Sequence, residues 1–139
     1  EPENVKIFVP DASIILKWVL EDEENNRDNA TALLRGWIEQ EHEFVVPSLW
    51  LYEVGNVLGI KRSKDAEKIL GILLEYEFKE MKITKDVTSI AFALMKEYRG
   101  VTFYDTIYHA VAIRNKGTMV TADKAYYTMA KDKGSILLF

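Results

Sequence analysis

The chain has 139 residues, of which 48% are hydrophobic, so it can form one domain (residues 1–139) with a substantial core. The absence of cysteine excludes a disulfide framework and thiolate chemistry, and a net charge of −4 disfavours nucleic-acid binding through bulk positive charge. No segment has the length and apolarity of a membrane span and no signal-peptide pattern opens the sequence, so we expect a cytoplasmic protein with no membrane contact.

Strands and helices alternate along the chain. We expect strands at residues 5–9, 44–46, 80–83, 119–121 and 136–139. We expect helices at residues 13–20, 26–41, 49–61, 64–77, 87–98, 104–116 and 123–133, with the acidic run 21–24 as a solvated loop. Ser48 and Asp86 are expected to cap the third and fifth helices. The alternation predicts an α/β domain with a mostly parallel sheet.

The first strand is followed directly by an acid. Residues 5–9 lack a clean polar alternation, which is typical of a strand covered on both faces, and Pro10 ends it. Asp11 therefore lies at the carboxyl end of the strand, the edge where α/β sheets bind ligands. The alternative is that Asp11 only caps the helix that follows.

A second acid lies inside a largely apolar helix. Glu53 has apolar neighbours one turn away on either side, which predicts partial burial. A buried charge has to be paired or bound to a metal. The alternative is a surface glutamate that extends into solvent or pairs with a lysine or arginine.

Two further acids lie near helix starts. Asp105 opens an almost wholly apolar helix, and Asp123 follows a strand as Asp11 does. Both can be explained as helix caps, and Asp105 could also pair with His109 one turn later. Parallel strands end at one edge of a sheet, however, and the following helices begin there, so the four acids are expected to converge. The repulsion among the four carboxylates has to be offset by a cation. Because the ligands are oxygens only, without cysteine or a clear histidine ligand, the cluster suits Mg²⁺ or Mn²⁺ rather than Zn²⁺.

Four stretches of the sequence resemble the PIN-domain nucleases, and most closely the VapC toxins of prokaryotic toxin–antitoxin pairs. They are VPDAS at 9–13, PSLWLYEVGNVL at 47–58, YDTIYHAVA at 104–112 and VTADK at 120–124. The resemblance implies a three-layer α/β/α sandwich with a central, mostly parallel sheet of four to five strands.

The resemblance also assigns roles to residues. It implies that the metal-binding, catalytic acids are Asp11, Glu53, Asp105 and Asp123, with supporting polar roles for Ser13, Asn56 and Thr121. Some relatives carry another acid shortly after the last one, where this chain has Ala125 and Tyr126, so a second metal has less support.

The function implied is that of an endoribonuclease dependent on Mg²⁺ or Mn²⁺, acting as the toxin of a toxin–antitoxin pair. The expected partners are an RNA substrate, a small antitoxin and a second copy of the chain in a homodimer. Residues 50–52 and 69–74 offer apolar surface for such contacts, and ordinary core packing explains them equally well. Four cations are candidates for contact with the RNA backbone, although solvated surface positions are the commoner explanation: Lys17, Arg114, Lys116 and Lys124.

Other functions are less well supported. A phosphoacceptor domain needs an adjacent acidic pair after the first strand and an aspartate after the middle strand. The sequence has neither: a single acid, Asp11, follows the first strand, and Thr84 and Lys85 follow the middle one. A histidine-pair ribonuclease is disfavoured because His42 is expected to be exposed and His109 has no partner histidine nearby. A non-catalytic PIN-like interaction module stays an alternative.

Overall fold

The computed structural model describes residues 5–20 and 27–139, and its centre is a four-stranded, wholly parallel sheet. The strands are β1 (Lys6–Pro10), β2 (His42–Phe44), β3 (Thr118–Thr121) and β4 (Ile136–Leu138), in the spatial order β2-β1-β3-β4. The acidic run 21–24 and the expected helix start at residue 26 lie outside the described residues. The predicted α/β class with a parallel sheet is confirmed.

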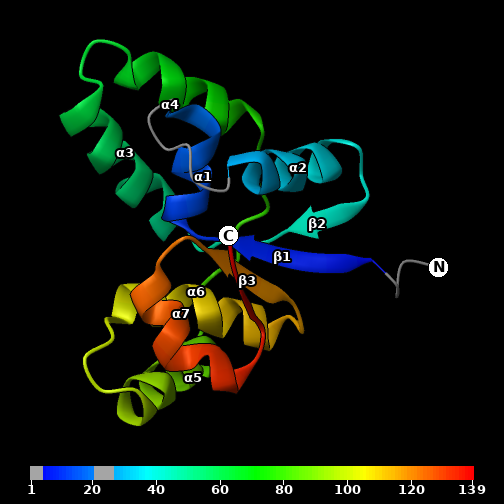
Figure 1. Ribbon diagram of the computed structural model, residues 1–139, viewed down its shortest axis with the longest axis vertical. Coiled ribbons are helices and arrows are strands. Elements are labelled where there is room, and N and C mark those ends of the chain that lie inside the picture. The colour runs from blue at the N-terminus through cyan, green and yellow to red at the C-terminus, as the bar shows by residue number, and fades with distance from the viewer. Residues whose placement is uncertain (1–4, 21–26) are drawn as a thin grey trace.

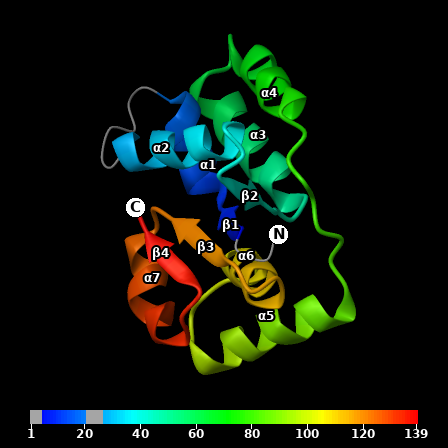
Figure 2. The ribbon, with the colours of Figure 1, turned by 90° about the vertical axis from the view of Figure 1, so that its right-hand side faces the viewer.

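Helices cover both faces of this sheet (Figure 1). One layer contains α1 (Ala12–Val19), α2 (Arg27–Ile38), α3 (Leu49–Lys61) and α4 (Ala66–Glu75). The other contains α5 (Lys85–Glu97), α6 (Phe103–Arg114) and α7 (Lys124–Ala130), the last extended by a 3₁₀ turn at Lys131–Lys133. Figure 2 shows the same two layers from the side, with the segment after α4 running down to α5. Among the described residues, no helix is long and apolar enough to cross a bilayer.

The register of the central strands places two polar residues side by side. Pro10 of β1 pairs with Val120 of β3, so the next residues, Asp11 and Thr121, are level with each other at the carboxyl edge. The backbone N–H of Asp11 continues the ladder by donating to the carbonyl of Val120 at 3.0 Å. The close approach of β1 to the start of β3 depends on Gly117, because a Cβ there would lie 2.6 Å from the carbonyl oxygen of Ile7.

The core is densest around α6 and around a group of aromatic rings. Residues 106–112 of α6 are all buried, since the helix packs against β1, β3 and α5. On the other side of the sheet, Trp18 and Trp37 stack on Phe44 with ring centroids 5.7 and 5.4 Å apart. Such offset aromatic contacts stabilise the layers beyond simple burial of area.

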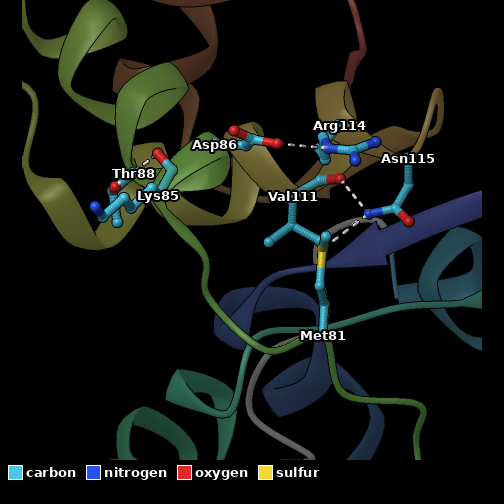
Figure 3. A network of polar contacts seen from close by, with 7 residues as sticks. All are labelled: Met81, Lys85, Asp86, Thr88, Val111, Arg114 and Asn115. Atoms are coloured by element: carbon cyan, nitrogen blue, oxygen red, sulfur yellow. Dashed lines mark hydrogen bonds and ion pairs between the residues drawn. The ribbon is translucent and has the colours of Figure 1, made fainter.

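The segment before α5 is joined to the carboxyl end of α6 (Figure 3). Asn115 Nδ2 donates to the sulfur of Met81 at 3.2 Å and to the carbonyl of Val111 at 2.7 Å. Arg114 Nε lies 3.9 Å from Asp86 Oδ2 in an exposed ion pair between α6 and α5. These contacts lie at the end of α6 opposite to Asp105.

Two predicted strands differ from the structure. The second strand ends at Phe44, because the peptide of Val46 pairs with the following segment instead: its N–H donates to Lys79 and its carbonyl accepts from Met81. The weak strand expected at residues 80–83 is reduced to a single parallel bridge between Val46 and Glu80.

Some predicted caps are also wrong. Ser48 occupies the N-cap position of α3, as predicted, but it has helical dihedral angles and its side chain makes no capping bond. Thr84, and not Asp86, holds the N-cap position of α5, so Asp86 lies in the first turn and faces Arg114.

Burial departs from the predictions at several side chains. Trp50 is 2% exposed, so it belongs to the core and not to an interaction surface. Leu74, in the segment 69–74 that was considered both as contact surface and as core, is 47% exposed, because it lies close to the carboxyl end of α4. His42 is half-buried instead of exposed: its Nε2 lies 2.7 Å from the carbonyl of Leu33.

Candidate metal centre

Asp11 is held by hydrogen bonds to both of its carboxylate oxygens. The residue is 6% exposed. Its Oδ1 accepts from the hydroxyl of Ser13 and from the backbone N–H of Ile14 at 3.2 Å, and its Oδ2 accepts from Thr121 Oγ1 at 2.6 Å. The bond from Ile14 caps α1, which confirms the capping interpretation. The two hydroxyl bonds show that the carboxylate is fixed by more than a cap.

Burial dominates the electrostatics of this carboxyl. It raises the pKa of Asp11 from 3.8 to about 6, while the hydrogen bonds from Ser13, Thr121 and Ile14 act in the opposite direction. The negative charge of Asp105 adds a smaller upward contribution. The site therefore keeps a charged Asp11 at neutral pH at a cost in stability, which a bound cation would offset.

Thr121 and Ser13 connect the ends of β1 and β3. The hydroxyl of Thr121, besides donating to Asp11, accepts the backbone N–H of Asp123 at 3.0 Å. Ser13 Oγ accepts the backbone N–H of Ala122 at 2.9 Å. Asp123 Oδ1 in turn caps α7 by accepting from the N–H of Tyr126 at 3.1 Å, so its capping interpretation is confirmed as well.

Glu53 lies on α3 and is fixed by a tyrosine of α6. The hydroxyl of Tyr108, a residue only 2% exposed, donates to Glu53 Oε1 at 2.7 Å. Burial raises the pKa of Glu53, the hydrogen bond from Tyr108 opposes this, and Asp105 raises it further. Glu53 is half-buried, as predicted from its apolar neighbours.

Asp105 lies in the first turn of α6 and is not the cap of that helix. Thr102 holds the N-cap position, and its hydroxyl oxygen accepts the backbone N–H of Asp105 at 3.1 Å. The suggested pairing with His109 is also wrong, since the two ring nitrogens of His109 lie 2.7 Å from Tyr126 Oη and 2.8 Å from the carbonyl of Gly134. Burial raises the pKa of Asp105, and the charge of Asp123 raises it further.

Asp105 is thus coupled by charge to each of the other three acids. It raises the pKa of Asp11 and of Glu53, and its own pKa is raised by Asp123. Within residues 5–20 and 27–139, no three acidic, histidine or cysteine side chains are close enough to enclose an ion by themselves. The oxygen-only donor set nevertheless fits Mg²⁺ or Mn²⁺, because these ions take oxygen ligands and Mg²⁺ keeps waters that can lie between it and a carboxylate.

Comparisons with known proteins identify the family of the chain. The PIN domain family profile matches residues 8–132. The chain belongs to the PIN domain family. Ribonuclease VapC3 of Pyrobaculum aerophilum is 30% identical over 128 residues, which are 86% of this chain and 91% of that protein.

Solved structures share the PIN-domain fold. A toxin–antitoxin complex from Klebsiella pneumoniae matches with a TM-score of 0.66 and 17% identity over 95% of both chains. VapBC2 from Rickettsia felis, bound to a DNA fragment from its promoter, matches with a TM-score of 0.67 and 16% identity over 96% of this chain and 97% of that one. The predicted α/β/α sandwich is therefore confirmed.

In this PIN domain the remaining predicted polar residues differ in placement. Asn56 lies exposed on α3, three residues after Glu53. Where a further acid was sought, Ala125 is exposed and Tyr126 is buried against His109. Sequence reasoning missed Tyr108, although a tyrosine on an otherwise apolar, buried helix needs a partner for its hydroxyl and could have been flagged.

The basic residues proposed for RNA contact separate into two groups. Arg114 and Lys116 lie at or after the carboxyl end of α6, away from Asp105, which argues against contact with a substrate at the acids. Lys17 is 5% exposed and lines a cavity of about 320 Å³ together with Lys61 and Asp123, so it is not a solvated surface lysine. Lys124 is exposed directly after Asp123 and stays a candidate.

Proposed function

We propose that this PIN domain is a metal-dependent endoribonuclease that acts as the toxin of a toxin–antitoxin pair. The observation that carries the proposal is the electrostatic coupling of Asp105 to Asp11, Glu53 and Asp123 in a chain related to a VapC ribonuclease. Clustered carboxylates with raised pKa values are typical of functional sites rather than of structural surfaces.

The four acids would hold one Mg²⁺ or Mn²⁺, with Asp11, Asp105 and Glu53 as ligands and Asp123 acting directly or through water. When bound, such an ion lowers the pKa of a coordinated water and stabilises charge on the phosphate. The chain contributes the fixed orientation of the carboxylates, which Ser13 and the other hydroxyl donors provide. In-line attack by water on a phosphodiester would leave a 5′-phosphate and a 3′-hydroxyl.

The partners follow from the same proposal. A small antitoxin would bind the toxin and block the acids, and two copies of the chain would form a homodimer. The exposed apolar side chains of α3 and α4 support such contacts: Tyr52 is 68%, Ile60 76% and Ile72 48% exposed. A Tyr52→Glu substitution would place a charge in this surface. Light scattering after size exclusion should show a dimer for the wild type and a monomer for the variant, and two dimers would contradict this assignment.

The nuclease proposal is tested by cleavage of a mixed RNA pool with Mg²⁺, Mn²⁺ or EDTA, beside Asp11→Asn. Cleavage should require metal and disappear in the variant. Asp86→Asn is the matched control: Asp86 is an exposed aspartate of α5 that pairs with Arg114, at the end of α6 opposite to Asp105, so its substitution should leave cleavage unchanged. A folded protein that binds Mn²⁺ without cleaving RNA would favour a non-catalytic module, and one that binds no metal would contradict the four-acid site itself.

A further inference from the structure

Hydrogen bonds within the protein already occupy lone pairs on the carboxylate oxygens of two acids, Glu53 and Asp11. Tyr108 Oη donates to Glu53 Oε1 at 2.7 Å, and the tyrosine is 2% exposed on a helix buried from residue 106 to residue 112. The ring cannot swing away without opening the core. One of the two lone pairs of Glu53 Oε1 is therefore occupied, whereas Oε2 keeps both of its lone pairs for a ligand.

Asp11 is restricted in a similar way. A carboxylate oxygen has two lone pairs, and both lone pairs of Oδ1 are used by Ser13 Oγ and by the N–H of Ile14. One lone pair of Oδ2 is used by Thr121, so a single accepting direction on Oδ2 stays available. Asp11 cannot present both of its oxygens without losing a hydrogen bond, and Glu53 can present Oε1 only through the one lone pair that Tyr108 leaves free.

We propose that the hydroxyls of Tyr108 and Ser13 are metal-selectivity determinants: by occupying lone pairs of Glu53 Oε1 and Asp11 Oδ1, they disfavour coordination of an ion through both oxygens of either acid. The inference rests on the proposed metal site. Mg²⁺ requires an octahedral set of ligands at short distance, which single oxygens and water satisfy, whereas Ca²⁺ takes more oxygens and readily accepts a carboxylate through both. The restriction thus disfavours Ca²⁺ without weakening binding of Mg²⁺ or Mn²⁺ to the same extent.

Calorimetric titration of metal-stripped protein with Mn²⁺ and with Ca²⁺ tests this role. The measured quantity is the ratio of the Kd for Ca²⁺ to the Kd for Mn²⁺. In Tyr108→Phe the occupied lone pair of Glu53 Oε1 is released, so the ratio should fall about tenfold, the equivalent of one hydrogen bond to a charged group. Tyr126→Phe is the matched control: it removes a buried hydroxyl that bonds to His109, and it should leave the ratio unchanged.

Ser13→Ala provides an independent variant on the other acid, and it decides the matter if Tyr108→Phe does not fold. Its ratio should fall in the same direction, because a lone pair of Asp11 Oδ1 is released. An unchanged ratio in the folded variants overturns the inference, and so does an equal fall in Tyr126→Phe, which would indicate general loosening. A wild type that binds neither ion overturns the metal site as well, whereas normal binding with unchanged ratios refutes only the selectivity role.

Discussion

Replacing Asp11 by asparagine should stabilise the metal-free protein. Burial raises the pKa of this carboxyl from 3.8 to about 6, so ionised Asp11 is less favourable in the folded than in the unfolded chain. At about 1.4 kcal/mol for each pKa unit, removing the charge should raise the free energy of unfolding by up to about 3 kcal/mol above neutral pH. The residue is 6% exposed, so solvent screening reduces this value little.

Asparagine preserves most of the local hydrogen bonds. Its side-chain oxygen can accept from Ser13 and Ile14 as Oδ1 of Asp11 does, and its NH₂ can donate to the hydroxyl of Thr121, which can rotate. The variant therefore isolates the charge from the packing. Loss of a hydrogen bond would lower its stability, opposite in sign to the expected change.

The difference in the free energy of unfolding between the variant and the wild type should depend on pH. Since the folded pKa of Asp11 is raised, its contribution to wild-type stability is greatest below pH 3.8 and is lost as the pH rises through about 6. The advantage of the variant should accordingly shrink to about 1 kcal/mol near pH 4.5.

Urea unfolding in EDTA at several pH values measures the difference in the free energy of unfolding between Asp11→Asn and the wild type. A second series with Mn²⁺ measures whether the metal reverses this difference. Mn²⁺ should stabilise the wild type and leave Asp11→Asn nearly unchanged, because a ligand that binds only the folded state adds to its stability. A variant that is less stable than the wild type at every pH would refute the account of a strained, buried charge.

Three further changes test the packing. Gly117→Ala should destabilise by about 1–3 kcal/mol, because the new Cβ would lie 2.6 Å from the carbonyl oxygen of Ile7; Gly59→Ala meets no atom within 4 Å and should gain about 0.5–1 kcal/mol in the same urea assay. Tyr126→Phe should cost about 1–3 kcal/mol at neutral pH, because His109 Nδ1 loses its partner. Burial lowers the pKa of His109 below 6.5. The neutral ring therefore contributes to the stability of the fold above pH 6.5, and this contribution falls as the pH is lowered. NMR titration of the ring should show protonation only below pH 6.5.

The sequence was sufficient to predict that the acids gather at one edge. In a parallel sheet the carboxyl ends of all strands meet, so Asp11, directly after β1, and Asp123, two residues after β3, had to lie on the same side. The bounds of α3 were predictable because its apolar residues repeat at helical spacing between Pro47 and the polar segment after Lys61.

Tertiary contacts decided the features that sequence reasoning missed. Val45 and Val46 have the composition of a strand, but the ladder between β1 and β2 ends at Phe44 because Val46 pairs with Lys79 and Met81 instead. The capping preferences of threonine and aspartate likewise do not decide which of two nearby residues caps α6. In the structure Thr102 holds the N-cap position that Asp105 could have filled.

The bond from Tyr108 to Glu53 joins residues 55 positions apart, and no local pattern encodes that distance. It also differs in kind from an ion pair. A hydroxyl orients a carboxylate while leaving its charge in place, and the pKa of Glu53 stays raised in spite of the bond. A lysine at the same place would neutralise the acid and remove its attraction for a cation. Neutral donors such as Tyr108 and Thr121 therefore allow the chain to fix its acids in position while their charges stay uncompensated, as the proposed metal site requires.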